Sequence, residues 1–263
     1  MVLITGLAGF IAGVAVNALA DGLPRTRTVR LPACHSCGAP RPRIAWSGLV
    51  ALLAGKSRCP YCAAPQGHRR HAVEIVAAAW SMVLGLILPA AKPYWPAFLL
   101  SMIFLLVFVI DYEHHLILHV VTGPAAVAMG LLGALDPSRG PSKTLVGGLV
   151  GFVTVLGLYL LGGLFARLIC RLRSQTLDEV ALGFGDVTLA GVIGLAVGFP
   201  GILVALVLGI LAGGIFSFGF LLSMIAWGRY VAFMPIPYSP FLILGALVVY
   251  LGGSSALSTL LPG

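Results

Sequence analysis

Long apolar runs separated by short polar stretches dominate the chain. Eight of these runs approach the roughly 20 residues that an α-helix needs to cross a bilayer. They cover residues 2–20, 72–91, 96–110, 116–135, 144–169, 186–199, 201–227 and 241–252. The third, sixth and eighth runs are short, which predicts tilted or partly shielded helices. The pattern therefore predicts an all-α polytopic membrane protein with about eight transmembrane helices.

The first run is interpreted as a transmembrane helix rather than as a cleaved signal peptide. Ala18-Leu19-Ala20 resembles a cleavage site, but no basic segment precedes the run, and the run is long for a signal peptide. The predicted organisation is therefore a first helix over 1–20, a loop domain over 21–71, and a membrane-embedded domain over 72–263.

The composition supports this picture and excludes a soluble domain. Hydrophobic residues make up 59% of the chain and charged residues only 9%, with a mean hydropathy of +1.05. Soluble domains carry about 25% charged residues. The net charge of +8 does not indicate a nucleic-acid partner, because the basic residues flank apolar runs, where they set orientation in the lipid bilayer.

The basic residues predict which ends of the helices face the cytoplasm. The loop 21–71 has only one acidic residue, and the positive-inside rule makes it cytoplasmic, with the N-terminus outside. Its basic residues are Arg25, Arg27, Arg30, Arg41, Arg43, Lys56, Arg58, Arg69 and Arg70. Threading eight helices then leaves only Lys92, Arg139 and Lys143 outside.

Two Cys-x-x-Cys pairs lie in the loop, Cys34 with Cys37 and Cys59 with Cys62. Each pair offers two thiolates on one tight turn, and four thiolates complete the tetrahedral site that structural zinc prefers. A short loop rich in arginine and proline also needs such a staple to fold. The sequence predicts a structural zinc site, with reduced thiol pairs or redox pairs as the alternatives.

Two acidic residues lie at the predicted cytoplasmic ends of apolar runs, Asp111 after the third and Asp186 at the start of the sixth. An acid at membrane depth is a functional hypothesis by default. Gly183 and Gly185 remove side chains beside Asp186, so a peptide substrate could approach closely there. If the two carboxylates meet, one keeps a proton, as in aspartic proteases. A pair of structural helix caps and a proton-coupled carrier remain as alternatives.

The other acidic residues need no catalytic role. Asp136 falls in a turn, Glu113 could face water, and Asp178 is expected in a solvated loop. Glu74 opens the second run and is expected to have a structural role, paired with Arg69 or Arg70.

Several motifs together resemble the type IV prepilin peptidases, membrane aspartyl proteases of the GxGD group. They are residues 110–117 (Ile-Asp-Tyr-Glu-His-His-Leu-Ile), residues 183–186 (Gly-Phe-Gly-Asp), the two cysteine pairs, residues 13–24, residues 71–74 and residues 236–241. The chain departs from the family at Ile117-Leu118-His119, where the family has Ile-Pro-Asp. It departs again over residues 42–46, where the family has Tyr-Glu-Asn-Ile-Pro.

The resemblance implies an enzyme of the bacterial inner membrane that cuts the basic leader of a type IV pilin or pseudopilin. Asp111 and Asp186 would be its catalytic pair on the cytoplasmic side. Many members also methylate the new N-terminus with S-adenosylmethionine, and the altered stretch at 42–46 leaves that second activity open. The competing function is a zinc-tethered carrier or membrane scaffold that uses the same acids as a relay or as caps.

Overall fold

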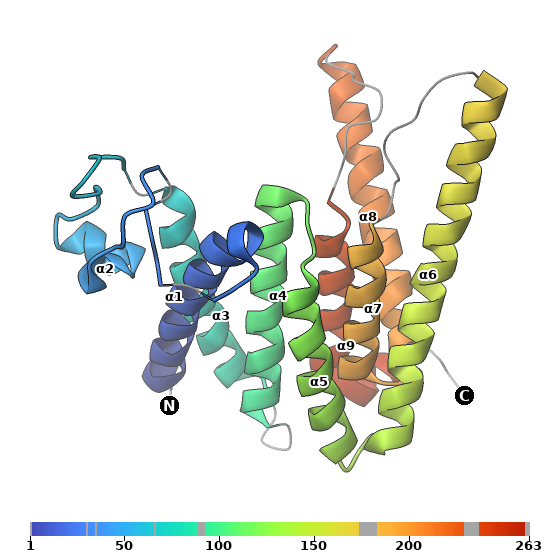
Figure 1. Ribbon diagram of the computed structural model, residues 1–263. Helices are drawn as coiled ribbons and strands as arrows, with labels where there is room; N and C mark the ends of the chain where they lie inside the picture. The colour runs from blue at the N-terminus through green and yellow to red at the C-terminus, as the bar shows by residue number, and fades with distance from the viewer. Residues whose placement is uncertain are drawn as a thin grey trace. The chain divides into compact units, whose positions relative to one another are not determined.

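The computed structural model describes residues 2–29, 31–34, 36–65, 67–88, 93–173, 183–228 and 237–260, and their regular structure is helical (Figure 1). Two isolated β-bridges, Ala33 with Pro40 and Arg58 with Pro65, occur in the loop after the first helix. The helices are α1 (Val2–Thr26), η1 (Arg43–Ala45), α2 (Gly48–Leu53), α3 (His68–Ile87), α4 (Tyr94–His114), α5 (His119–Leu135), α6 (Gly140–Arg173), α7 (Phe184–Val197), α8 (Gly201–Ala226) and α9 (Ser239–Leu260).

Eight of these helices coincide with the eight predicted apolar runs. Among the described residues, α1, α3, α4, α8 and the Gly140–Phe165 part of α6 are long and apolar enough to cross a membrane. The helices α5, α7 and Ser239–Gly252 of α9 are shorter and apolar. The chain is thus an all-helical, multi-pass membrane protein, as predicted. The third run differs from its prediction, because its helix begins at Tyr94 and continues to His114, which makes it long enough to span.

The chain divides into two compact units, Met1–Val120 and Val121–Gly263. The first unit contains α1 to α4, and the second contains α5 to α9. The division falls within the segment 72–263, which was predicted to be one membrane-embedded domain. Each unit is described by itself below.

In the first unit, α1 packs closely along α3, and α4 packs against both (Figure 1). Small residues make this approach possible. A Cβ atom on Gly9 would overlap the backbone oxygen of Ala77, and one on Gly13 would lie 3.0 Å from the Ala77 Cβ. Glycine and alanine at such positions let helix backbones touch without a hydrophobic driving force between them.

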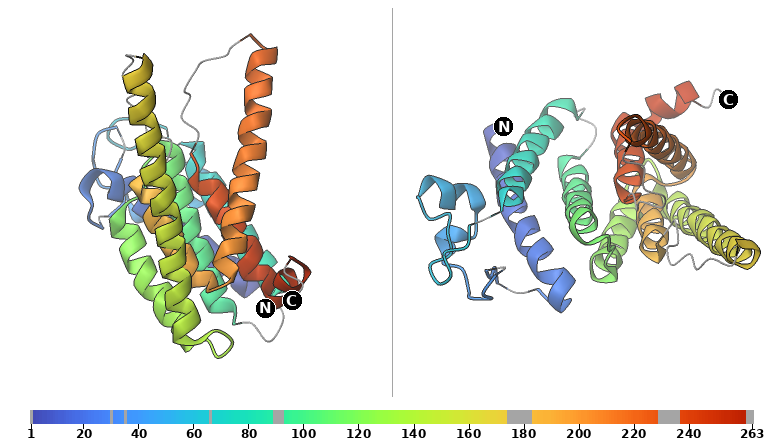
Figure 2. Two further views of the ribbon diagram at one scale, coloured as in Figure 1. Left: turned by 90° about the vertical axis from the view of Figure 1, so that its right-hand side faces the viewer. Right: turned by 90° about the horizontal axis from the view of Figure 1, so that it is seen from above.

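In the second unit, glycine seams join α6 to α7 and α8 to α9. A Cβ atom on Gly147 would lie 2.5 Å from the backbone oxygen of Gly194. A Cβ atom on Gly245 would overlap the backbone oxygen of Ala205. The helices α8 and α9 lie side by side in both views of Figure 2. The backbones of these pairs are therefore in direct contact, which fixes the direction of α7 and of its first residues.

Candidate functional site

Asp111 lies in the last turn of α4 and is 7% exposed. The two residues before it, Val109 and Ile110, are buried in the apolar part of the helix. The helix ends at His115, which adopts a left-handed conformation, and its N–H donates to the Asp111 carbonyl oxygen at 2.8 Å. The carboxylate thus sits where an apolar helix gives way to polar residues.

Asp186 lies in the first turn of α7 and is 8% exposed. The backbone N–H of Gly183 donates to its Oδ2 atom at 3.0 Å, and the N–H of Asp186 donates to the Gly183 carbonyl oxygen at 3.0 Å. This reciprocal pair satisfies donors that a helix start leaves free. The positive end of the helix dipole also favours the ionised carboxylate.

Gly183 leaves room for a side chain beside Asp186. A Cβ atom on Gly183 would lie 3.7 Å from the Asp186 Oδ2 atom, which is an ordinary van der Waals contact. Gly183 has extended backbone angles, so its conformation does not require glycine. Among the described residues, nothing therefore demands glycine at this position. A requirement for it would come from a molecule that approaches Asp186 from outside.

The two acids belong to different units, Asp111 to the first and Asp186 to the second. Each is a buried carboxylate at the end of an apolar helix, the last turn of α4 and the first turn of α7.

A second feature of the first unit is an ion network close to Asp111 in sequence. The guanidinium of Arg69 pairs through Nη2 with Asp21 and through Nη1 with Glu113 at 2.7 Å. Arg70 also pairs with Asp21, at 3.0 Å. The network connects the end of α1, the start of α3 and the end of α4.

Glu74 is fully buried and holds the loop domain. Its carboxylate accepts hydrogen bonds from the Ser47 hydroxyl at 2.8 Å and from the backbone N–H groups of Gly48 at 2.7 Å and Leu49 at 3.0 Å. The Asn17 amide donates to it at 3.3 Å. The structural role expected for Glu74 is therefore present, but the expected pairing with Arg69 or Arg70 is wrong.

The pairing of Asn17 with Glu74 was not predicted from the sequence. Asn17 is fully buried on α1, and its amide also donates to the Arg70 carbonyl oxygen at 3.0 Å. The signal in the sequence is an amide in the middle of an apolar run. Such residues face a polar partner inside the helix bundle, because an unsatisfied amide in hydrocarbon is costly.

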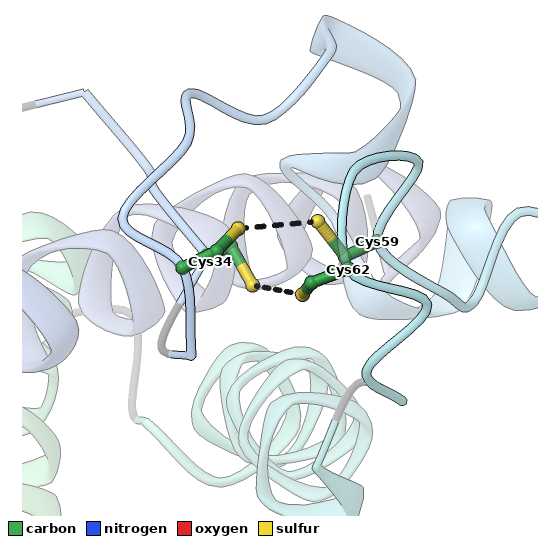
Figure 3. Close-up of side chains that lie close together, drawn as sticks. Cys34, Cys59 and Cys62 are labelled. Atoms are coloured by element: carbon green, nitrogen blue, oxygen red, sulfur yellow. Dashed lines mark hydrogen bonds between the residues drawn. The ribbon is translucent and has the colours of Figure 1, made fainter.

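The four loop cysteines come together in two similar turns (Figure 3). In the first, the Cys34 N–H bonds the Ala39 oxygen at 2.8 Å. In the second, the Cys59 N–H bonds the Ala64 oxygen at 2.9 Å. Gly38 has a φ of 72° and the equivalent Ala63 a φ of 56°. The repeated conformation points the sulfur atoms toward a common centre.

The sulfur positions fit a tetrahedral metal. Cys34 Sγ lies 3.7 Å from Cys62 Sγ, Cys37 Sγ lies 3.8 Å from Cys59 Sγ, and all four lie within 4.8 Å of one another. A zinc ion with Zn–S bonds of about 2.3 Å would separate its ligands by about 3.8 Å. The sequence prediction of a four-cysteine cluster is confirmed.

The charge state of the cluster also fits a cation. Backbone N–H groups of Cys37 and Ser36 stabilise the Cys34 thiolate and lower its pKa to about 6. A backbone hydrogen bond at Ala64 acts to lower the pKa of Cys62, but desolvation and the neighbouring thiols outweigh it and raise that pKa to about 12. Four thiolates therefore need a positive charge among them, which a divalent metal supplies.

The fold and these sites define a class of polytopic membrane protein that has buried acids at helix ends and a cysteine-rich loop. The family model described as "Type IV leader peptidase family" matches residues 98–218, which include Asp111, Gly183, Gly185 and Asp186. Over this segment the chain is similar to that family.

Curated relatives agree with the family match. The chain is 26% identical over 225 residues to the prepilin leader peptidase/N-methyltransferase of Aeromonas salmonicida, covering 84% of this chain and 71% of the relative. It is 23% identical over 235 residues to the protein of the same name from Aeromonas hydrophila, covering 89% and 76%. No solved structure matches the chain.

Proposed function

We propose that the chain is an aspartyl endopeptidase that removes the basic leader of type IV prepilins or pseudopilins. The observation that carries the proposal is the position of Asp186, a buried carboxylate at the glycine-flanked start of α7 within the segment that matches the family. Asp111 lies in the same segment, also buried at a helix end. The prepilin substrate follows from the names of the relatives.

In the proposed mechanism, Asp186 is the ionised member of the pair, because the Gly183 N–H and the start of α7 favour its charged form. It takes a proton from a water molecule, and the resulting hydroxide attacks the peptide carbonyl carbon. Asp111 begins protonated and donates its proton to the carbonyl oxygen, which gives a tetrahedral gem-diol. The gem-diol then collapses: the Asp111 carboxylate takes back a hydroxyl proton, Asp186 gives its proton to the amine nitrogen, and the C–N bond breaks. The proposal requires the two carboxylates to meet at the substrate, where they would share one proton and titrate as a pair.

We place the active site at the cytoplasmic face of the bacterial inner membrane. The support is the distribution of basic residues, which predicts that the loop 21–71, the end of α4 and the start of α7 all face the cytoplasm. A cytoplasmic site suits a substrate whose leader is basic and short.

We propose that Cys34, Cys37, Cys59 and Cys62 hold one structural zinc ion. The support is the spacing of the sulfur atoms and the need for a cation among four thiolates. Four protein ligands leave no open position for substrate or water, so zinc would contribute to folding rather than to the reaction. The chain's own residues carry the chemistry.

A second activity, N-methylation of the cut pilin with S-adenosylmethionine, is supported by the names of the relatives. Residues 42–46 depart from the family, and within them Arg43–Ala45 forms η1. Purified protein, prepilin and labelled S-adenosylmethionine test this directly. Label on the cut pilin supports a bifunctional enzyme, and leader removal without label transfer makes the chain a peptidase only.

The peptidase proposal is tested with purified protein in proteoliposomes and a prepilin, with leader loss followed by mass. Asp111→Asn and Asp186→Asn should each reduce turnover by at least about 10³-fold, because groups that act as a unit fail together. Asp136→Asn is the control, since Asp136 pairs with Arg139 in the turn before α6. Turnover at the wild-type rate by either catalytic variant would favour the carrier or scaffold function instead.

A further inference from the structure

The guanidinium of Arg69 binds two carboxylates at once, an arrangement we call the Arg69 fork, and the proposed reaction does not use it. One side chain pairs with two carboxylates from two helices, Asp21 at the end of α1 and Glu113 in the last turn of α4. Arg70 Nη2 completes the network at 3.0 Å from Asp21, so two positive and two negative groups balance. Three helix ends are thereby joined on one side of the first unit.

We propose that Arg69 is a positioning residue, which acts through Glu113 to set the orientation of Asp111. The inference rests on the peptidase function proposed above. Asp111 and Glu113 are two residues apart on α4, so they project about 200° apart around the helix axis. Holding Glu113 against Arg69 therefore turns Asp111 to the opposite side of α4 and fixes the rotation of this turn.

The position of these residues explains why a tether is needed there. The last turn of a helix lacks part of its backbone hydrogen bonding and frays readily. His115 follows as the C-cap, in a left-handed conformation. Proton transfer requires a precisely placed carboxylate, because a displacement of about 1 Å can lower the rate by about 10²-fold. A restraint on this turn therefore favours catalysis by Asp111.

The chemistry of the fork requires arginine. Its two Nη atoms reach two separate carboxylates at once, which a single ammonium group at the end of a flexible stem does not reproduce. Arg69, Asp21 and Glu113 keep only 21%, 19% and 34% of their side chains exposed, so the network is mostly buried. Breaking it is therefore expected to lower stability as well as kcat.

The experiment compares steady-state kinetics of Arg69→Gln, Glu113→Gln, the double variant and Arg69→Lys in proteoliposomes. Each single glutamine variant should lower kcat by about 10-fold with KM within about twofold of the wild type. The double variant should be no slower than either single variant, because both break one tether. Arg69→Lys should fall between wild type and Arg69→Gln.

Asp136→Asn is the matched control for Glu113→Gln. It breaks an arginine ion pair of the same 2.7 Å length and similar exposure, 21% and 29%, in the turn before α6. Its kcat should equal that of the wild type. The kinetics are compared at a temperature at which every variant stays folded and keeps its metal content, so that a lower kcat at unchanged KM reports positioning rather than unfolding.

Wild-type kcat in both Arg69→Gln and Glu113→Gln would overturn the proposal, as would losses that multiply in the double variant. With Asp111→Asn inactive, either result would leave the peptidase function standing. Turnover by Asp111→Asn at the wild-type rate would remove the aspartyl mechanism and the positioning role together. The two failures are therefore distinguishable in one set of measurements.

Discussion

The carboxylate of Glu74 lies 2.7 Å from the backbone nitrogen of Gly48, although 26 positions separate the two residues. Glu74 belongs to α3, whereas Gly48 begins the short helix α2 of the cysteine-rich loop. The same carboxylate accepts from Leu49 and from the Ser47 hydroxyl. One buried acid of the helix bundle therefore provides the capping that the loop helix needs at its start.

Glu74→Gln should release the loop from the helix bundle while α3 remains in place. The amide offers one acceptor oxygen in place of two and adds donors facing other donors. The expected loss is about 2–3 kcal/mol of loop docking. Limited trypsin digestion should then cut the loop, at Arg43, Lys56 or Arg58, at least about 10-fold faster than in the wild type.

Ser47→Ala provides the graded comparison. The Ser47 hydroxyl donates to Glu74 and accepts from the Val50 N–H at 3.2 Å, so its loss removes one cap and leaves two backbone bonds to the carboxylate. A loss of about 1 kcal/mol is expected. Equal digestion rates for wild type, Ser47→Ala and Glu74→Gln would show that Glu74 does not hold the loop.

The paired replacement of Cys34 and Cys59 by serine should remove the metal. Serine at one position of each turn leaves only two thiolates, which cannot satisfy a tetrahedral zinc site. Elemental analysis of protein purified without chelator should find about one zinc per wild-type chain and none in the variant. Wild-type protein without zinc would contradict the assignment, whatever the activity.

The two cysteine turns predict opposite effects of glycine and alanine. Ala63 has a φ of 56°, where a side chain costs about 1–2 kcal/mol, whereas Gly38 occupies the equivalent place at 72° without that cost. Ala63→Gly should stabilise the loop by about 0.5 kcal/mol after the entropy cost of glycine, and Gly38→Ala should destabilise it by about 1 kcal/mol. Chelator-driven zinc release should be slower in the first variant and faster in the second. The same direction of change in both would contradict the prediction.

Gly183→Ala tests whether Gly183 is needed for substrate binding rather than for folding. The added Cβ has room, 3.7 Å from Asp186, so stability should change by less than about 0.5 kcal/mol. If a peptide backbone approaches Asp186 at this point, kcat/KM for prepilin should fall by at least about 10-fold.

Gly147→Ala is the contrasting variant for Gly183→Ala. Its Cβ would lie 2.5 Å from the backbone oxygen of Gly194 in the α6–α7 seam, so it should destabilise the protein by about 1–3 kcal/mol. Thermal denaturation in detergent measures both effects. Full activity of Gly183→Ala would remove the substrate role of this glycine.

The helices and the cysteine cluster could be predicted from the sequence because their signals are local. Eight apolar runs became eight apolar helices, and the Cys-x-x-Cys spacing alone predicted two turns that share one centre. Boundaries were less predictable. The fourth run was expected to begin at residue 116, but α5 begins at His119, because His115 leaves the helical conformation and residues 116–118 connect the two helices.

The partners of the buried polar residues could not be predicted in the same way. Arg69 and Arg70 lie one turn from Glu74 on the same helix, which suggests a local pair, whereas both turn toward Asp21 and leave Glu74 to Ser47 and the α2 backbone. The partners of these arginines depend on how α1 packs against α3, and a local sequence pattern does not predict that packing. Asp178 lies outside the described residues, so its expected place in a solvated loop stays a prediction.

The anchoring of the loop by Glu74 has a consequence for the order of events during biosynthesis. All four cysteines precede Glu74 in the chain, so the ribosome completes the cysteine cluster first. At about 5–20 residues per second, Glu74 follows about a second later, and the anchor forms only once α3 has emerged. The four cysteines can therefore come together before the anchor exists, whereas α2 gains its Glu74 cap only when α3 arrives.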